Sequence, residues 1–167
     1  MLWLIPFLLL ATLLQVVIVP GVPPIGIRPD LVLVLIVAWG TLRGWESGLV
    51  AGLVGGFFVD LTSAAPFGVN VFRLGAVGLS AGVLAERLAR TSALVPVVAA
   101  VVGSLLGFVL MVVALQTVRW PIAWEHLFVF SAVPNAVLTG VAMAVAFPGV
   151  RLLDRLTARP AAEESAS

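Results

Sequence analysis

Two charged residues stand at the edges of long apolar runs in this sequence, where a charged side chain could do chemistry. Asp60 and Arg73 lie on either side of a turn that contains Pro66 and Phe67. A charge at the centre of a membrane costs at least about 2.5 kcal/mol, so each side chain needs a partner or a path to water. Three interpretations remain open. The two side chains snorkel to the headgroups, pair as a salt bridge across a helical hairpin, or take part in a proton or ion relay.

Amide side chains make up the rest of the intramembrane polar set. Asn135 follows Pro134 inside the last apolar run, and Gln15 and Gln116 lie in two others. Proline leaves a backbone carbonyl of its helix for other donors to satisfy. Pro134-Asn135 therefore predicts either a helix kink with an interhelical hydrogen bond or a site that contacts a substrate. His126 falls between apolar runs, where we expect a solvated loop position.

No arrangement of residues in the sequence is typical of a catalytic or metal site. The chain has no Cys and a single His, which excludes thiolate ligands and leaves little for an imidazole cage. No nucleophile elbow, phosphate-binding loop or paired histidine motif occurs. Asp60 by itself lacks the second group that acid–base chemistry requires. We therefore expect no catalytic residues, no metal and no cofactor.

The composition indicates which elements position these side chains. Hydrophobic residues make up 62% of the chain and charged residues 10%, against about 25% charged in soluble domains. Mean hydropathy is +1.21. The formal charge of +1 offers no basic surface for nucleic acid, so we expect no nucleic-acid partner. The sequence predicts an all-α integral membrane protein that contacts membrane lipid.

Apolar runs long enough for membrane crossing predict about six transmembrane helices. The runs cover residues 2–19, 31–42, 44–62, 69–85, 94–118 and 127–150. The first lacks a basic flank and a cleavage site, so we expect it to be retained. The second would give a helix only about 18 Å long, too short for the full membrane core. Such a helix either crosses incompletely, is sunk beside its neighbours, or lies in a locally thinned membrane. Residues 1–155 are expected to form one polytopic domain, followed by a flexible cytoplasmic tail over residues 156–167.

The arginines predict the orientation of the bundle. Six crossings put both termini on one side. That side carries Arg43, Arg87, Arg90, Arg151, Arg155 and Arg159, whereas Arg28, Arg73 and Arg119 fall on the other. Because positive residues are concentrated in cytoplasmic loops, we expect both termini in the cytoplasm.

Glycine recurs at every fourth position along one stretch of the chain. This glycine ladder consists of Gly40, Gly44, Gly48, Gly52 and Gly56. Small residues at this spacing let two helix backbones approach closely, which drives association where apolar side chains gain little by leaving lipid. Two interpretations stay open, namely packing within this chain and a groove for a transmembrane helix of a partner protein.

Two short motifs identify a family. The first is Arg28-Pro29-Asp30 at the start of the second run, where Asp30 is suited to cap a helix N-terminus. The second motif ends the glycine-rich run, as Gly55-Gly56-Phe57-Phe58-Val59-Asp60-Leu61-Thr62-Ser63-Ala64-Ala65-Pro66-Phe67-Gly68-Val69-Asn70. Together they resemble MreD, the bacterial rod shape-determining membrane protein. Arg28, Pro29, Asp30, Pro66, Gly68 and Asn70 are the motif residues that carry this resemblance.

The resemblance implies a non-enzymatic scaffold of the cell-elongation machinery in the bacterial cytoplasmic membrane. The implied partners are an MreC-like bitopic protein, the RodA glycosyltransferase with its class-B penicillin-binding protein and, indirectly, the MreB cytoskeleton. The family is also thought to share its fold with the substrate-binding subunits of energy-coupling-factor transporters. A vitamin-binding transport subunit therefore remains the alternative function.

Overall fold

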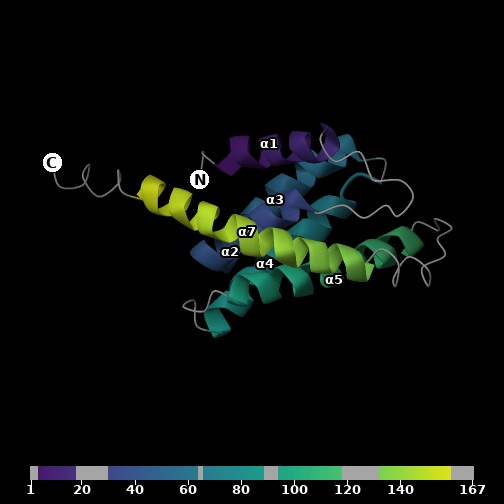
Figure 1. Ribbon diagram of the computed structural model, residues 1–167. Coiled ribbons are helices and arrows are strands. Elements are labelled where there is room, and N and C mark those ends of the chain that lie inside the picture. Colours follow the sequence, from purple (N-terminus) through teal and green to yellow (C-terminus); the bar gives the residue numbers. More distant parts are fainter. Residues whose placement is uncertain (1–3, 18–29, 64–65, 89–93, 118–131, 159–167) are drawn as a thin grey trace.

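The computed structural model describes residues 4–17, 30–63, 66–88, 94–117 and 132–158, and this part of the chain is a bundle of helices without strands (Figure 1). The helices are α1 (Leu4–Val17), α2 (Leu31–Arg43), α3 (Trp45–Thr62), α4 (Val69–Arg87), α5 (Leu94–Thr117) and α7 (Val133–Ala158). Together with the apolar surface described below, this confirms the prediction of an all-α membrane protein.

The short helix α2 lies in the middle of the bundle. It packs against each of the other five described helices. Val32, Leu33, Ile36 and Val37 on its sides are at most 1% exposed, so apolar neighbours surround it in nearly every direction. Of the three explanations for a short second run, the structure shows the helix sunk among its neighbours.

Local signals in the sequence set the two ends of α2. The carboxylate of Asp30 accepts a hydrogen bond from the backbone N–H of Leu33 at 3.0 Å, which confirms the expected N-cap. At the other end Gly44 has a φ of 97°, a conformation that L side chains rarely adopt, and its N–H donates to the carbonyl of Gly40. The chain turns there and α3 begins at the next residue.

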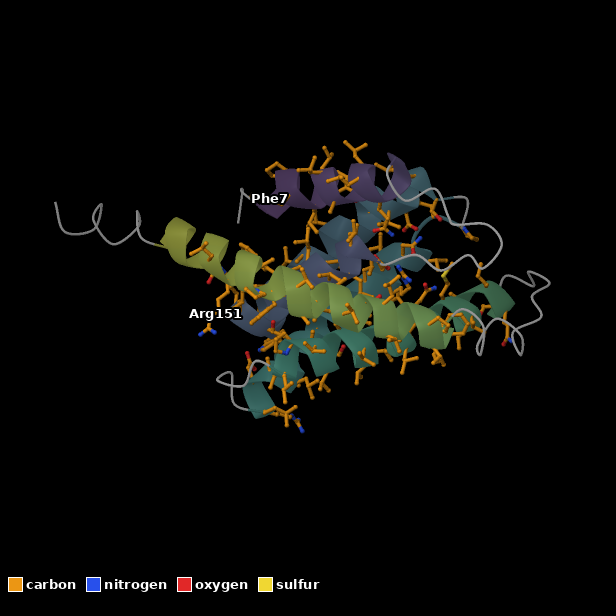
Figure 2. All side chains as sticks on the ribbon, in the orientation of Figure 1. Phe7 and Arg151 are labelled. Atoms are coloured by element: carbon orange, nitrogen blue, oxygen red, sulfur yellow. The ribbon has the colours of Figure 1, made fainter. Side chains whose placement is uncertain are left out.

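The outside of the bundle is apolar. Figure 2 shows carbon-rich side chains over most of its surface. Among the described helices, three are long and apolar enough to cross a membrane, namely Val69–Arg87 in α4, Leu94–Thr117 and Val133–Leu152. Helices α1 and α2 are shorter apolar helices. The chain is thus a membrane protein, and its six crossings stay a prediction.

Charged groups gather at one end of the bundle. The start of α1 and the end of α7 lie toward the same side (Figure 1). There Arg43, at the end of α2, pairs with Asp154 of α7 at 2.7 Å and stacks over the ring of Trp39 with its Cζ 4.5 Å from the centroid. Arg151 points away from the bundle at the same end (Figure 2). Helix α7 continues to Ala158, three residues past the expected domain boundary at 155.

Candidate functional site

Asp60 caps the helix that follows its own. It lies near the end of α3, and its side chain reaches across the turn to the N-terminus of α4. One carboxylate oxygen accepts from the backbone N–H groups of Gly68 at 2.9 Å and Val71 at 3.1 Å. The other accepts from the backbone N–H of Asn70 at 3.1 Å and from its side-chain amide at 2.9 Å. Three of these four bonds satisfy backbone N–H groups that a helix start leaves without partners.

The salt bridge between Asp60 and Arg73, one of the three interpretations left open by the sequence, is not formed in the structure. Arg73 instead donates from Nη2 to Asp30 at 2.9 Å, and the two side chains are 15% and 17% exposed. Asp60 does not need a cation, because the positive end of the α4 dipole and four N–H groups stabilise its charge. The sequence-based argument looked for a partner side chain or a path to water for Asp60. It did not consider the adjoining N-terminus of α4.

The glycine ladder packs inside the chain. A Cβ on Gly48 would overlap the carbonyl oxygen of Gly78, and a Cβ on Gly52 would overlap that of Leu74. On Gly56 it would lie 2.5 Å from the carbonyl oxygen of Asn70. Helix α4 thus occupies this face, so the ladder is not a groove for a partner helix in this fold.

The other two ladder residues lie outside α3. Gly40, on α2, also faces Gly78, with its Cβ position 3.0 Å from the carbonyl oxygen. Gly44 forms the turn between α2 and α3. The five glycines are therefore divided between two helices and a turn, although their spacing suggested a single row.

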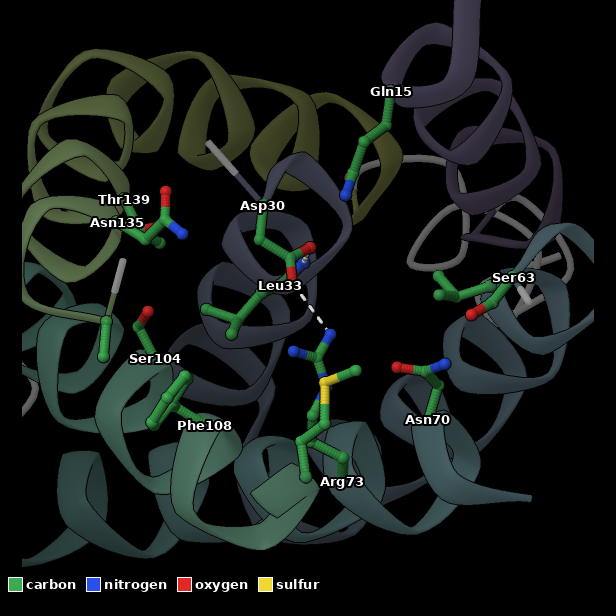
Figure 3. A pocket seen from close by; sticks show the side chains of 13 residues that line it. Gln15, Asp30, Leu33, Ser63, Asn70, Arg73, Ser104, Phe108, Asn135 and Thr139 are labelled. Atoms are coloured by element: carbon green, nitrogen blue, oxygen red, sulfur yellow. Dashed lines mark hydrogen bonds and ion pairs between the residues drawn. The ribbon is translucent and has the colours of Figure 1, made fainter. Parts of the chain in front are cut away.

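A polar cavity of about 220 Å³ lies beside the Asp30–Arg73 pair (Figure 3). Arg73 and Asn70 reach it from α4, and Asp30 from the start of α2. Asn135 and Thr139 line it from α7. The cavity gathers side chains from the whole bundle, including Gln15 of α1, Ser63 at the end of α3 and Ser104 of α5.

Several of these side chains hold the cavity walls in place. Gln15 accepts a hydrogen bond through Oε1 from the backbone N–H of Val32 at 3.3 Å, which ties α1 to the start of α2. The Asp30–Arg73 pair ties α2 to α4. Pro134 falls in the first turn of α7, where the backbone N–H that proline lacks would have no partner within the helix. Proline at this position does not force the kink that the sequence predicted. Asn135 lines the cavity, and its interhelical hydrogen bond remains a prediction.

The cavity resembles a binding site more than a catalytic one. Within the described residues, no group of three or more His, Cys, Asp or Glu could hold a metal ion. Asp30 and Arg73 neutralise each other, which leaves neither as a free acid or base. Two polar atoms of cavity-lining residues, Nε of Arg73 and Oγ1 of Thr139, are buried without a partner among the described protein atoms.

The comparison with known families decides the identity. The family model described as rod shape-determining protein MreD matches residues 1–157. The chain belongs to the MreD family. No curated protein and no solved structure gives a significant match. The resemblance inferred from the two motifs is thereby confirmed, and the role in rod shape follows from the MreD family description.

The MreD motif residues fall at the ends of helices. Asp30 caps α2, Gly68 precedes α4 with a φ of 99°, and Asn70 binds Asp60. Pro66 accepts a hydrogen bond through its carbonyl from the N–H of Val69 at 3.3 Å. Arg28 and Pro29 lie outside the described residues.

Sequence reasoning missed the glycines on α4 and the threonine in the cavity. Gly75, Gly78 and Gly82 face α3. Their spacing of three and four residues puts them on one face of a helix, which is the pattern of small residues that indicates close helix packing, so the sequence did contain this signal. Thr139 gave no comparable signal. A single threonine in an apolar helix commonly bonds its own backbone, as Thr12 does with the carbonyl of Leu8.

Proposed function

We propose that this protein is a non-enzymatic scaffold of the rod-shape complex in the bacterial cytoplasmic membrane. The observation that carries the proposal is the match of residues 1–157 to the MreD family. The polar groups of the described helices support it, because they hold helices together or line one small cavity and do not form an acid–base pair.

The proposed partner is an MreC-like bitopic protein, whose single helix packs against this bundle. Through it the scaffold supports peptidoglycan synthesis by RodA and its class-B penicillin-binding protein, with MreB engaged indirectly. Both termini are proposed to lie in the cytoplasm, on the side where the Arg43–Asp154 pair is found.

The partner helix has to use an outer face of the bundle, since α4 covers the glycine ladder. Exposed apolar side chains lie on three of the outer helices, for example Leu10 on α1, Val109 on α5 and Val141 on α7. Packing between helices in lipid depends on close van der Waals contact, so these three faces are the candidates to compare.

Site-specific photocrosslinking in the native host's membranes tests this proposal. A photoreactive amino acid is placed at Leu10, Val109 or Val141, with the fully buried Val37 as the control position. We expect an MreC-like protein to be captured from at least one exposed position and not from Val37. Capture of transporter ATPase subunits, with no elongation protein at any position, would contradict the scaffold and favour a transport subunit.

A further inference from the structure

The cavity contains polar groups whose hydrogen-bonding capacity the described protein atoms do not use. Thr139 is 0% exposed and its Oγ1 has no partner there, and the same holds for Nε of Arg73. Both residues line the cavity. Leaving a buried polar group unsatisfied costs about 1–3 kcal/mol, so each of these two atoms calls for a partner that the described protein atoms do not supply.

The two groups lie on different walls. Figure 3 shows Thr139 and Asn135 together on α7, with Arg73 and Asp30 across the cavity from them. Nη2 of Arg73 donates to Asp30 at 2.9 Å, which holds the guanidinium plane in place, and Nε is a buried donor with no acceptor among the described protein atoms. An occupant that satisfies both walls therefore needs two polar ends.

The chemistry of the two walls selects those ends. An arginine N–H can only donate, and its planar guanidinium suits phosphate or carboxylate oxygens. The neighbouring carboxylate of Asp30 repels a second full negative charge, so a ligand of low net charge fits better than a dianion. The threonine hydroxyl can accept from an ammonium or a hydroxyl group.

We propose that this cavity binds a small zwitterionic group, with its phosphate or carboxylate on Arg73 and its ammonium or hydroxyl end on Thr139. A volume of about 220 Å³ is enough for a group of phosphoethanolamine size. Leu33, Phe108 and Met111 give the cavity an apolar side as well. The same chemistry is offered by a phospholipid headgroup and by a free solute, and this binding is independent of the scaffold function.

Calorimetric titration of the full chain in a neutral detergent tests the proposal. The probes are dihexanoylphosphatidylethanolamine, phosphoethanolamine and inorganic phosphate. The variants are Thr139→Val, which keeps the side-chain shape, and Arg73→Lys, which keeps the charge next to Asp30 and removes Nε. Thr41→Val is the matched control, because Thr41 is also buried, on α2, but bonds the carbonyl of Ala38 and lies outside the cavity.

We expect a zwitterionic probe to bind more tightly than inorganic phosphate. Thr139→Val and Arg73→Lys should each weaken it by roughly three- to tenfold, the value of one hydrogen bond, while Thr41→Val leaves it unchanged. Binding of the short-chain lipid alone identifies a headgroup, and binding of phosphoethanolamine as well identifies a free solute. Affinities that are equal in all variants would overturn the proposal. The absence of binding by every probe would also overturn it, if chemical labelling of the cavity residues is then blocked only when the partner protein is present.

Discussion

Replacing Asp60 with asparagine tests how the α3–α4 hairpin is held. The two carboxylate oxygens of Asp60 accept two hydrogen bonds each, from groups at the start of α4. Asparagine has the same shape but only one acceptor oxygen. If its NH₂ group faces Gly68 and Val71, two backbone N–H donors lose their acceptor. If it faces Asn70, only one backbone N–H does, because the Asn70 amide can turn and accept from it. Asp60 is 5% exposed, so water does not readily replace the lost acceptor.

The magnitude follows from the number of donors that lose their acceptor. Each buried donor that loses its acceptor costs about 1–3 kcal/mol, and the better orientation leaves one such donor, so Asp60→Asn should destabilise the bundle by about 1–3 kcal/mol. The loss of charge at the α4 N-terminus adds about 0.3–1 kcal/mol.

Thermal unfolding in a mild detergent measures the effect. Glu46→Gln is the matched control, because it makes the same chemical change at an exposed position in the first turn of α3. We expect a large drop in the unfolding midpoint for Asp60→Asn and little change for Glu46→Gln. Equal, small shifts in the two variants would show that the Asp60 hydrogen bonds do not stabilise the hairpin.

The other predictions concern the ion pairs and the glycines. In a double-mutant cycle on unfolding free energy, Asp30→Asn and Arg73→Gln should couple by about 1–3 kcal/mol. The losses from Asp60→Asn and Arg73→Gln should instead add within about 0.5 kcal/mol. The reverse pattern would mean that Arg73 pairs with Asp60 and not with Asp30. Gly52→Ala should cost about 2 kcal/mol or more in the same unfolding assay, because its Cβ overlaps the backbone of α4. Gly149→Ala, which meets nothing within 4 Å in α7, should be neutral or stabilising, and similar losses in both would refute the close approach. Asp154→Asn should cost at most about 1 kcal/mol of unfolding free energy, because the side chains of Arg43 and Asp154 are 33% and 23% exposed and water screens the pair. A larger loss would mean that this pair stabilises the bundle more than an exposed ion pair does.

The helices could be predicted from the sequence because local signals define them. The expected runs 31–42 and 44–62 match α2 and α3 within one residue, since Asp30 and Gly44 set the boundaries. The start of α4 at Val69 was predicted from the turn that ends in Gly68. Apolar length and turn residues act within a few positions along the chain, so no tertiary information was needed.

The contacts between helices could not be predicted in the same way. Arg73 finds Asp30 across 43 residues only because α2 is sunk between α4 and its other neighbours. The glycine ladder indicated close packing, but the identity of the opposite helix depended on the α3–α4 turn and on glycines at Gly75, Gly78 and Gly82. Thr139 became notable only when the cavity placed it opposite Arg73.

Depletion of this protein in its own rod-shaped host, with cell shape as the readout, tests the scaffold function most directly. The proposed function predicts that depleted cells widen and round up, that the wild-type chain restores the rod, and that Glu46→Gln restores it equally well. Cells that keep their rod shape after depletion, and instead lose uptake of a small molecule, would contradict it.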